Sequence, residues 1–519
     1  MAAPSIDEVY PILQPGKLDK LLLCGLLDAS SKTVYGFSKS KKPYKLFTPF
    51  NNKFPKFIVQ YKGNGTNCIV SIKYVAFDSK LRYPLGQITQ SFGSVSNAAK
   101  NMDLLIIYAA ALIHYNGYCH VSKVKFDVSL HMLNSIYYSD SRVDNYHVKK
   151  NDFKFICNID PEGCEDIDDL VSYHEDGDKR LIGVHIIDII YVLSLFKTLG
   201  IDAINRDRFS TVYGYRTNWG ILPDILIENF LSLAPGNKKY VWSVYLNISS
   251  EHEIIDYNLK TEIIYNQKSY SYESVSTKNL DILPDFCNQY GKKHLRTIYD
   301  AYENHLDNSH YIISVLMIIA NRVIGQELIM RDDMIYRVTD KMCGKYSFND
   351  KKNMHFNLQI SNYTHFTSPI RRFVDQYVHS KLYENKFGFK PLDFDISPEM
   401  LININEALLE TKDLNNKYKM LNLVSFERLN SCKLIEIKYS DDRVYLKWFV
   451  QNAGKIIDSL DNVLVEKISD TSLYFNRFLE DETIGGERRL KLDLNMVLDL
   501  KILFLVRSKH PQLCISYEV

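Results

Sequence analysis

The sequence predicts a multidomain protein in which small β-barrels of the OB or cold-shock kind flank a mixed α/β domain. From Lys17 to Gly93, strand-like runs alternate with turn residues at short intervals, which is typical of such barrels. Helical and strand-like runs are mixed from there to about Asn385, and short strands return from Ser431 to Val519. We therefore predict a tail at 1–16, a first barrel at 17–95, an α/β domain with its connecting helices at 96–430 and a degenerate barrel at 431–519.

The first barrel carries the clearest local charge. Its expected strands are residues 21–28, 32–38, 44–50, 56–61 and 68–77. Met1 to Lys62 contains ten lysines against four acidic residues, although the whole chain has a net charge of only +1. Lysines that track phosphates beside aromatic side chains that stack on bases are typical of single-stranded nucleic-acid binding, with Lys45, Lys53 and Lys56 as candidates. Period-two alternation also requires part of these aromatics to fill the barrel, so we expect both roles.

The bulk composition excludes several classes of protein. The 46% hydrophobic and 24% charged fractions are those of an ordinary globular chain. Nine scattered cysteines without a CxxC pair argue for reduced thiols and against a zinc site or a disulfide framework. The N-terminus lacks the features of a signal peptide, and the longest apolar runs, of about ten residues, are too short to span a bilayer. We expect an intracellular, cytoplasmic protein without a membrane segment.

In the central domain, the stretch NIDPEGCEDIDD contains four aspartates: Asp160, Asp166, Asp168 and Asp169. A strand is expected to end at Asp160, and a hairpin with its turn at Asp176-Gly177 is expected to begin at the last two aspartates. Such closely spaced carboxylates raise one another's pKa unless a cation compensates, and Mg²⁺ is the usual ion. The alternative is a solvated acidic loop.

Three further elements follow along the chain. Apolar residues at helical spacing predict a helix over 310–329, and a Ser-Pro start predicts another over 397–430. The same signal at Ser368-Pro369 predicts a helix with Arg371 and Arg372 in its first turn, where the helix dipole is adverse to cations. A bound phosphate would relieve that conflict, whereas the simpler alternative is a salt bridge to Asp375.

Three stretches of the sequence resemble motifs of the ribonuclease II family of RNB-domain exoribonucleases. They are Ile159-Asp160-Pro161 with Asp166-Ile167-Asp168-Asp169, the run Gly183 to Asp188 (GVHIID), and the run Tyr363 to Phe373 (YTHFTSPIRRF). RDRFSTVYGY and ILPDILIENFLSLAPG are similar to further family stretches, and the motifs occur in the family's order over roughly residues 17–430. Their joint occurrence is far more specific than either DIDD or SPIRR alone.

The resemblance implies an α/β catalytic domain between RNA-binding OB-type barrels. It also implies Mg²⁺-dependent, processive 3′-to-5′ hydrolysis of single-stranded RNA to nucleoside 5′-monophosphates. Two Mg²⁺ ions about 4 Å apart, with Mn²⁺ as a substitute, would serve the attacking and leaving oxygens.

Carried over by position, the resemblance implies a role for each candidate residue. The four aspartates would bind metal, and Asp168 would matter most to the chemistry. Arg371 would contact the scissile phosphate. Tyr213 would stack on a base, with Arg208 and Arg372 as further RNA contacts. His185 and Asp188 would support the acidic cluster from behind, although a hydrogen-bonded core histidine is an equal alternative for His185.

The chain also departs from the family pattern. The glutamate expected just before Met317 is absent, since Ser314, Val315 and Leu316 stand there, and the family's HRxL reads His379-Ser380-Lys381-Leu382. Two alternatives stay open beside the active exoribonuclease. One is a catalytically weakened RNA-binding or assembly subunit that keeps the fold. The other is a DNA exonuclease, which would be indifferent to the 2′-hydroxyl.

Overall fold

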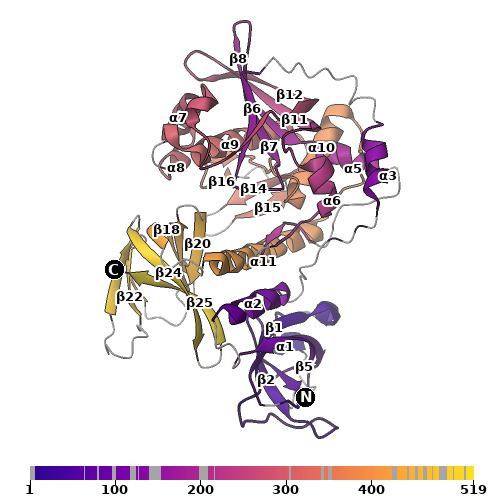
Figure 1. The fold of residues 1–519 in the computed structure, drawn as a ribbon, viewed down its shortest axis with the longest axis vertical. Coiled ribbons are helices and arrows are strands. Elements are labelled where there is room, and N and C mark those ends of the chain that lie inside the picture. The colour runs from indigo at the N-terminus through magenta and orange to yellow at the C-terminus, as the bar shows by residue number, and fades with distance from the viewer. Residues whose placement is uncertain are drawn as a thin grey trace. The chain divides into compact units, whose positions relative to one another are not determined.

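The computed structural model contains two compact units (Figure 1). The first groups Met1–Ser122, Val212–Trp219 and Leu409–Val519, and the second groups Lys123–Thr211 and Gly220–Leu408. The structure describes residues 6–13, 15–63, 65–78, 81–95, 101–116, 124, 126, 128–139, 153–197, 208–214, 217–302, 305–339, 344–348, 354–423, 429–440, 443–450, 454–459, 465–469, 472–477, 488–494, 496–507 and 510–518.

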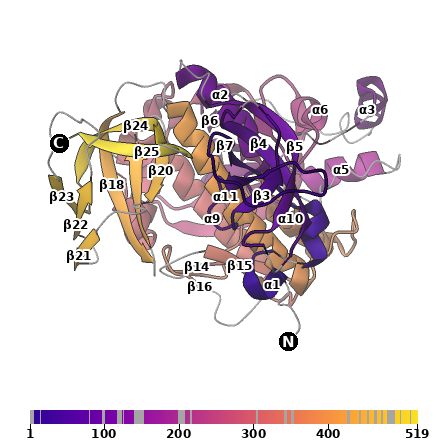
Figure 2. The same ribbon diagram turned by 90° about the horizontal axis from the view of Figure 1, so that it is seen from below.

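The first unit begins with a closed five-stranded barrel, as the sequence predicted. Its strand order is β1-β2-β3-β5-β4, and Figure 2 shows β3, β4 and β5 side by side. The strands are β1 Leu22–Asp28, β2 Tyr44–Pro49, β3 Phe57–Gln60, β4 Cys68–Ala76 and β5 Leu85–Ser94, after the short helices α1 Ile6–Val9 and η1 Pro15–Lys20. Phe47 and Phe57 fill the barrel core, so part of the aromatic series is structural.

One predicted barrel strand is wrong and one was missed. Residues 32–38 form only an isolated bridge from Phe37 to Pro43, because Gly36 with φ 123° breaks the extended backbone. The fifth strand is instead β5, whose polar sequence LGQITQSFGS carries a weak hydrophobic alternation. Pairing with β4 and β3 therefore defines this strand more than its own composition does.

The rest of the first unit packs against the barrel or forms separate sheets. Helix α2 Asn101–Ala111 and η2 Leu112–His114 share a core with Cys24 of β1 and with Leu414 and Tyr418 of α11 Pro398–Leu423. Ser397 caps α11 by accepting the Met400 N–H at 3.1 Å, which confirms the predicted Ser-Pro start. The remaining strands are β9 Val212–Tyr213, β10 Asn218–Trp219, β18 Leu429–Ser440, β19 Arg443–Val450, β20 Gly454–Ser459, β21 Val465–Ser469, β22 Ser472–Arg477, β23 Arg488–Asp493, β24 Val497–Arg507 and β25 His510–Glu518.

The described C-terminal strands, in the region of the predicted degenerate barrel at 431–519, form two sheets. One has five strands in the order β20-β19-β18-β24-β25, and the other has three in the order β21-β22-β23. Each strand in these sheets is antiparallel to its neighbours.

The second unit is built on a six-stranded sheet with the order β12-β11-β8-β7-β6-β13. β11 is buried along ten consecutive residues, as expected for a strand whose two faces are both covered. The hairpin of β7 and β8 confirms the prediction for that stretch, and β11 pairs with β12 in antiparallel orientation. The strands are β6 Phe155–Asp160, β7 Asp169–Asp176, β8 Lys179–Ile187, β11 Lys238–Ile248, β12 Ile254–Tyr265 and β13 Lys268–Ser271.

Helices and a small four-stranded sheet complete the second unit. α9 runs from Ser309 to Glu327 and confirms the predicted helix; Asn308 caps it by accepting the Tyr311 N–H at 3.0 Å. None of the helices in the described ranges combines the length and the hydropathy that a membrane crossing requires. The other elements are α3 Leu130–Tyr137, α5 Ile189–Lys197, α6 Asp224–Leu226, η3 Ile227–Leu231, η4 Thr277–Leu280, α7 Leu283–His294, α8 Arg296–Tyr299, η5 His305–Asp307, β14 Ile335–Thr339, β15 Gly344–Phe348, β16 Met354–His355, β17 Ile360–Ser361 and α10 Phe373–Phe387.

Candidate active site

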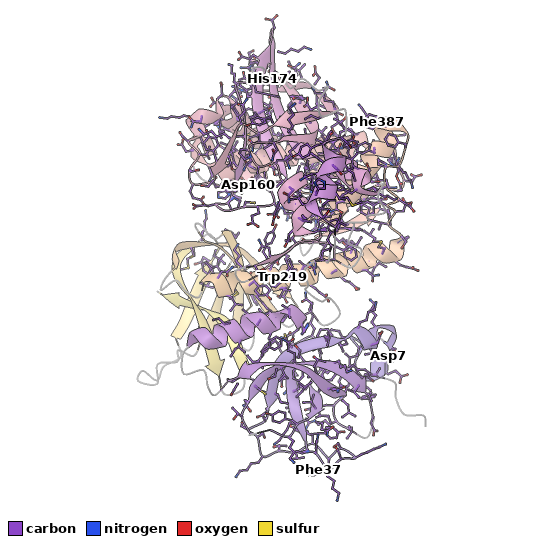
Figure 3. The ribbon with its side chains drawn as sticks, turned by 45° about the vertical axis from the view of Figure 1, so that its right-hand side comes forward. Asp7, Phe37, Asp160, His174, Trp219 and Phe387 are labelled. Atoms are coloured by element: carbon purple, nitrogen blue, oxygen red, sulfur yellow. The ribbon has the colours of Figure 1, made fainter. Side chains whose placement is uncertain are left out.

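The acidic cluster lies at one end of the six-stranded sheet. β6 ends at Asp160 and its antiparallel neighbour β7 begins at Asp169, so both carboxylates stand at the same edge. Asp166 and Asp168 lie on the connecting segment, whose tight turn requires Gly163 in the left-handed region at φ 76°. Figure 3 shows Asp160 near the opposite end of this sheet from His174, which belongs to the β7–β8 hairpin.

Burial and mutual repulsion disfavour the charged forms of these aspartates. Burial raises the pKa of Asp168 well above its usual value, and Asp166 and Asp169 raise it further. Burial and the neighbouring Asp160 raise the pKa of Asp169 to about 8. Burial also raises the pKa of Asp160, with Asp166 adding to the effect. The carboxylates therefore lie close enough to interact, and each would be stabilised by an added cation.

Asp168 is the meeting point of two distant segments. Its side chain is only 3% exposed, and its Oδ1 accepts the Ile370 N–H at 2.7 Å from a residue 202 positions away. The Nε of Arg371 lies 3.4 Å from Oδ2 of the same carboxylate, and both the Arg371 cation and the Ile370 N–H lower the pKa of Asp168. Arg371 is 46% exposed, so its guanidinium can contact Asp168 and an external anion together.

The predicted helix start at Ser368-Pro369 is wrong, because α10 begins at Phe373. The backbone of Arg372 is extended, with φ −132°, and Arg372 forms a bridge with Ser210. The Asp375 carboxylate accepts the Ser368 N–H at 2.8 Å, so the residues before Arg372 form a turn instead of a helix. The Nη2 of Arg372 donates to the same Asp375 oxygen at 2.8 Å. Arg372 thus makes the salt bridge that was the alternative, whereas Arg371 reaches the acidic cluster.

The other predicted RNA contacts divide between the units. In the second unit, the Nη1 of Arg208 donates to the Gly220 carbonyl at 2.8 Å. Arg208 lies two residues before Ser210, which forms the bridge with Arg372. Tyr213 belongs to the first unit, where its N–H donates to the Asn415 Oδ1 at 2.9 Å.

The three predicted lysines also belong to the first unit, in or beside its barrel. Lys45 stands on β2, and its ammonium donates to the carbonyls of Ser31 and Thr33. Lys53 and Lys56 are exposed on the segment between β2 and β3.

His185 and Asp188 have structural partners. His185 is fully buried on β8, where Ser172 bonds its Nε2 at 2.8 Å and Ser243 its Nδ1 at 2.7 Å, and burial lowers its pKa to about 4. This geometry matches the core-histidine alternative. Asp188 accepts the Tyr191 N–H at 3.2 Å and so caps α5, and its other oxygen accepts the hydroxyl of Tyr383.

Tyr272 and His310 stand beside the cluster, and our reading of the sequence did not single them out. Their rings are stacked, with centroids 3.7 Å apart and an interplanar angle of 13°. The Tyr272 N–H donates to the Asp160 carbonyl at 3.2 Å, and besides burial the nearby Asp169 and Asp160 raise the pKa of the Tyr272 hydroxyl. With 36 tyrosines in the chain, no local signal distinguishes this one.

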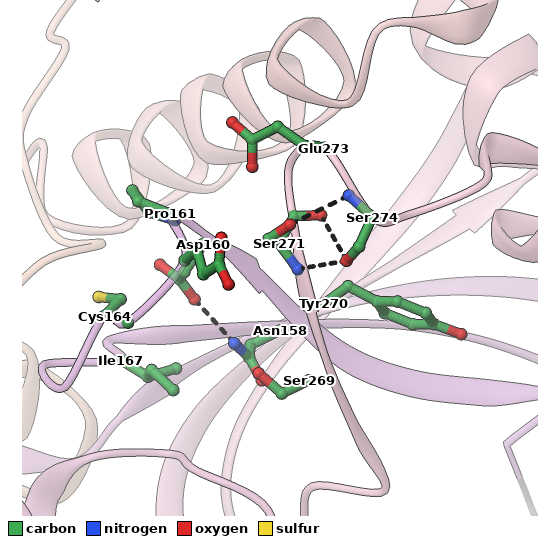
Figure 4. A pocket seen from close by; sticks show the side chains of 12 residues that line it. Asn158, Asp160, Pro161, Cys164, Ile167, Ser269, Tyr270, Ser271, Glu273 and Ser274 are labelled. Carbon is green, nitrogen blue, oxygen red and sulfur yellow. Dashed lines mark hydrogen bonds between the residues drawn. The ribbon is translucent and has the colours of Figure 1, made fainter. Parts of the chain in front are cut away.

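A cavity of about 510 Å³ adjoins Asp160 (Figure 4). Its walls come from the end of β6, the following turn and β13, and they carry the carboxylates of Asp160, Glu162 and Glu273. Asn158 donates to the Asp160 Oδ2 at 3.0 Å, while Ser271 and Ser274 bond to one another. This acidic wall suits cations and water better than it suits a phosphate.

The donor set of the cluster fits a divalent cation, but its geometry is not that of a preformed metal site. Within the residues that the structure describes, no group of three or more His, Cys, Asp or Glu side chains is placed to hold a metal ion. Carboxylate oxygens are nevertheless the ligands that Mg²⁺ prefers, and burial together with the neighbouring carboxylates raises the pKa values of Asp160, Asp168 and Asp169, an effect that a bound cation would oppose.

The model of the RNB domain family matches residues 150–282 and 341–387, which include all four aspartates and Arg371. These two segments of the chain are therefore similar to the RNB domain. DIS3-like exonuclease 2 of Schizosaccharomyces pombe is 28% identical over 264 residues, covering 47% of this chain and 26% of that protein. Ribonuclease R of Chlamydia pneumoniae is 23% identical over 335 residues, covering 48% of each. The matched part of the chain thus spans about a quarter to a half of these relatives.

Solved structures show the same fold. Ribonuclease R of Mycoplasma genitalium, in complex with ribose-methylated single-stranded RNA, superposes with a TM-score of 0.62 and 14% identity, covering 93% of this chain and 87% of that one. Yeast Ssd1, described as a pseudonuclease, reaches a TM-score of 0.56 with 13% identity over 88% of this chain and 68% of that one. The chain therefore has a ribonuclease R-like fold, which confirms the predicted fold class. Because RNB relatives include an inactive exonuclease of Arabidopsis thaliana, the domain alone does not establish turnover.

Proposed function

We propose that this protein is a 3′-to-5′ exoribonuclease that hydrolyses single-stranded RNA to nucleoside 5′-monophosphates. The observation that carries the proposal is the contact of Asp168 with Ile370 and Arg371. This contact places the guanidinium of Arg371 next to the cluster of carboxylates. Phosphodiester hydrolysis requires both: carboxylates to hold a divalent metal, and a cation to stabilise the charge that develops on the phosphate.

Asp160, Asp166, Asp168 and Asp169 would hold the metal, with two Mg²⁺ ions expected and Mn²⁺ as a substitute. When bound, Mg²⁺ supplies an activated water and Lewis-acid stabilisation of the attacking and leaving oxygens. Asp168 is buried, so its contact with the Ile370 N–H keeps one of its oxygens in a fixed orientation. Binding of a divalent cation would lower the raised pKa values of the cluster and keep its members ionised.

Arg371 would bind the scissile phosphate. Its Nε is oriented by Asp168 and its Nη2 donates to the Ser368 Oγ at 3.0 Å, so the guanidinium is anchored while part of it is exposed. A fork of N–H groups in this position can donate to two phosphate oxygens. The ring of Tyr272, next to Asp160, offers a flat surface for a base or a ribose, and His310 covers one of its faces.

The decisive experiment uses single-stranded RNA labelled at its 5′ end, incubated with the protein and Mg²⁺. We expect a ladder that ends in a short 5′ fragment, together with free nucleoside 5′-monophosphates. Asp168→Asn should abolish mononucleotide release and retain RNA binding, whereas Asp178→Asn, in the exposed β7–β8 turn, should behave as wild type. Turnover that survives Asp168→Asn unchanged would refute the mechanism.

A second candidate, an RNA-binding or assembly subunit without turnover, is favoured by one feature. Where the family pattern expects a glutamate, α9 carries Val315 and Leu316, which are fully buried, and Ser314, whose hydroxyl bonds that of Tyr302 at 3.3 Å. RNA binding without mononucleotide release, even with Mn²⁺ supplied, would establish this reading. Competition between RNA and DNA of one sequence tests the DNA exonuclease alternative, because only an RNA enzyme uses the 2′-hydroxyl.

A further inference from the structure

One face of α10 holds the turn that precedes it. The Nε2 of Gln376 donates to the Pro369 carbonyl at 2.9 Å, and the Nε2 of His379 donates to the Phe366 carbonyl at 2.9 Å. The ring of His379 also stacks on Phe366, with centroids 4.2 Å apart and an interplanar angle of 18°. Positions 376 and 379 lie three residues apart, so both side chains point from one side of the helix to the turn.

The side chains of Gln376 and His379 are buried and uncharged. Gln376 is 1% exposed and His379 is fully buried. Burial lowers the pKa of His379 to about 3, so its imidazole is neutral and a single N–H of the ring bonds the carbonyl. Bulk water therefore does not compete for either hydrogen bond, and neither side chain changes its protonation state near neutral pH.

The turn held in this way supplies both groups that contact Asp168. The Ile370 N–H donates to the carboxylate at 2.7 Å and the Arg371 Nε lies 3.4 Å from it. Ile370 directly follows Pro369, whose carbonyl Gln376 binds. A shift of this carbonyl would move the Ile370 N–H and the Arg371 side chain together, and a misplacement of about 1 Å in an active site can cost about 10²-fold in rate.

We propose that Gln376 and His379 are positioning residues for catalysis, which fix the Phe366–Arg371 turn so that Ile370 and Arg371 meet Asp168 and the scissile phosphate. The proposal rests on the proposed ribonuclease function. Neither side chain contacts the reacting atoms. Their effect should therefore appear in kcat, where the geometry of the transition state counts, and not in the affinity for RNA, to which the rest of a long substrate contributes.

The test compares two substitutions on the same helix. Gln376→Met keeps an unbranched side chain of similar length but removes the donor to Pro369. Tyr377→Phe is the matched control, because it also removes one hydrogen bond from a buried side chain, the 2.6 Å bond from the Tyr377 hydroxyl to the Asp333 carbonyl. We expect Gln376→Met to lower kcat by about 10- to 100-fold with KM within about two-fold of wild type, and Tyr377→Phe to leave both unchanged.

His379 allows a rescue test. His379→Phe keeps an aromatic ring to stack on Phe366 but removes the N–H donor, whereas His379→Gln can place an amide N–H close to the position of Nε2. If the hydrogen bond positions the turn, the glutamine variant should retain more of the wild-type kcat than the phenylalanine variant. The opposite order would show that ring packing alone matters and would overturn the role given to His379.

A second measurement separates this proposal from the proposed function. Amide hydrogen exchange of a peptide covering residues 366–372, measured without RNA or metal, should be faster in Gln376→Met and unchanged in Tyr377→Phe. If wild type shows no turnover, the proposed function fails, and the exchange of this peptide alone decides whether Gln376 holds the turn. Unchanged exchange in Gln376→Met, or an unchanged kcat in an active enzyme, would overturn the proposal.

Discussion

Replacing Asp169 by asparagine should make the metal-free protein more stable at neutral pH while it removes a proposed metal ligand. Asp169 begins β7, and its carboxylate lies near Asp160 in a buried part of the cluster. Burial and this neighbour raise its pKa to about 8, far above the ordinary value of 3.8. Asparagine has nearly the same shape and no ionisable group, so it removes this electrostatic cost without a large change in packing.

The sign and size of the effect follow from that pKa. The unfolded chain loses the Asp169 proton near pH 4, whereas the folded protein keeps it until about pH 8. The free energy of unfolding therefore falls as the pH rises through this window, by about 1.4 kcal/mol per pH unit and up to about 4 kcal/mol at pH 7. Because a minor part of Asp169 remains exposed to solvent, which screens its charge, we expect about 2–3 kcal/mol in practice.

Urea unfolding in EDTA at pH 5 and pH 7 measures this effect. Asp169→Asn should gain about 2–3 kcal/mol over wild type at pH 7 and clearly less at pH 5. Asp178→Asn, which removes the same charge from the exposed β7–β8 turn, should change stability little at either pH. Millimolar Mg²⁺ should stabilise wild type by mass action and stabilise Asp169→Asn less. A variant that is less stable than wild type at pH 7 in EDTA would refute this account of the cluster.

Three further substitutions test other parts of the second unit. Arg371→Gln should lower kcat by about 10²- to 10³-fold in single-turnover assays, with Arg371→Lys recovering only part of the loss, because a lysine cannot donate in a bidentate way. Lys239→Met should stabilise the protein by about 2 kcal/mol at pH 7, since burial lowers the pKa of this lysine to about 8. Urea unfolding should show that gain shrinking as the pH rises from 8 towards 10.5, where the unfolded chain also loses the proton. Tyr272→Ala should weaken binding of a short oligonucleotide, while Tyr257→Ala, at an exposed position on β12, should leave it unchanged in a fluorescence titration.

The sequence alone placed much of the candidate site because its elements are locally encoded. The strand ending at Asp160 and the hairpin with its turn at Gly177 follow from apolar runs and turn residues within about thirty positions. Antiparallel pairing then brings Asp160 and Asp169 to the same edge without any long-range information. Helix α9 could be predicted for the same reason, since its apolar spacing and its Asn308 cap are local signals.

The remaining features depend on partners that lie far apart in the chain. The sequence left two roles for His185, support of the acidic cluster or a hydrogen-bonded histidine in the core. Only its hydrogen bonds with Ser172 and Ser243, from neighbouring strands, place it in the core of the sheet. Tyr272 approaches the cluster because β13 pairs in parallel with β6 across about one hundred residues. Neither hydrophobic periodicity nor a turn signal encodes the pairing of such distant strands. Sequence patterns therefore identify the strands without showing which strand each one pairs with.

The misplaced start of α10 changes how the phosphate site is understood. With Arg371 in the first turn of a helix, its guanidinium would oppose the helix dipole, and a phosphate would bind mainly to the helix terminus. In the structure, the backbone N–H of Ile370 donates to Asp168, and that of Ser368 donates to Asp375, so neither amide is directed at a substrate. The attraction for phosphate then rests on the guanidinium of Arg371, whose position depends on Asp168 and Ser368. This is why substitution of Arg371, which lies in the turn before α10, should be more damaging than removal of a hydrogen bond that α10 makes to this turn.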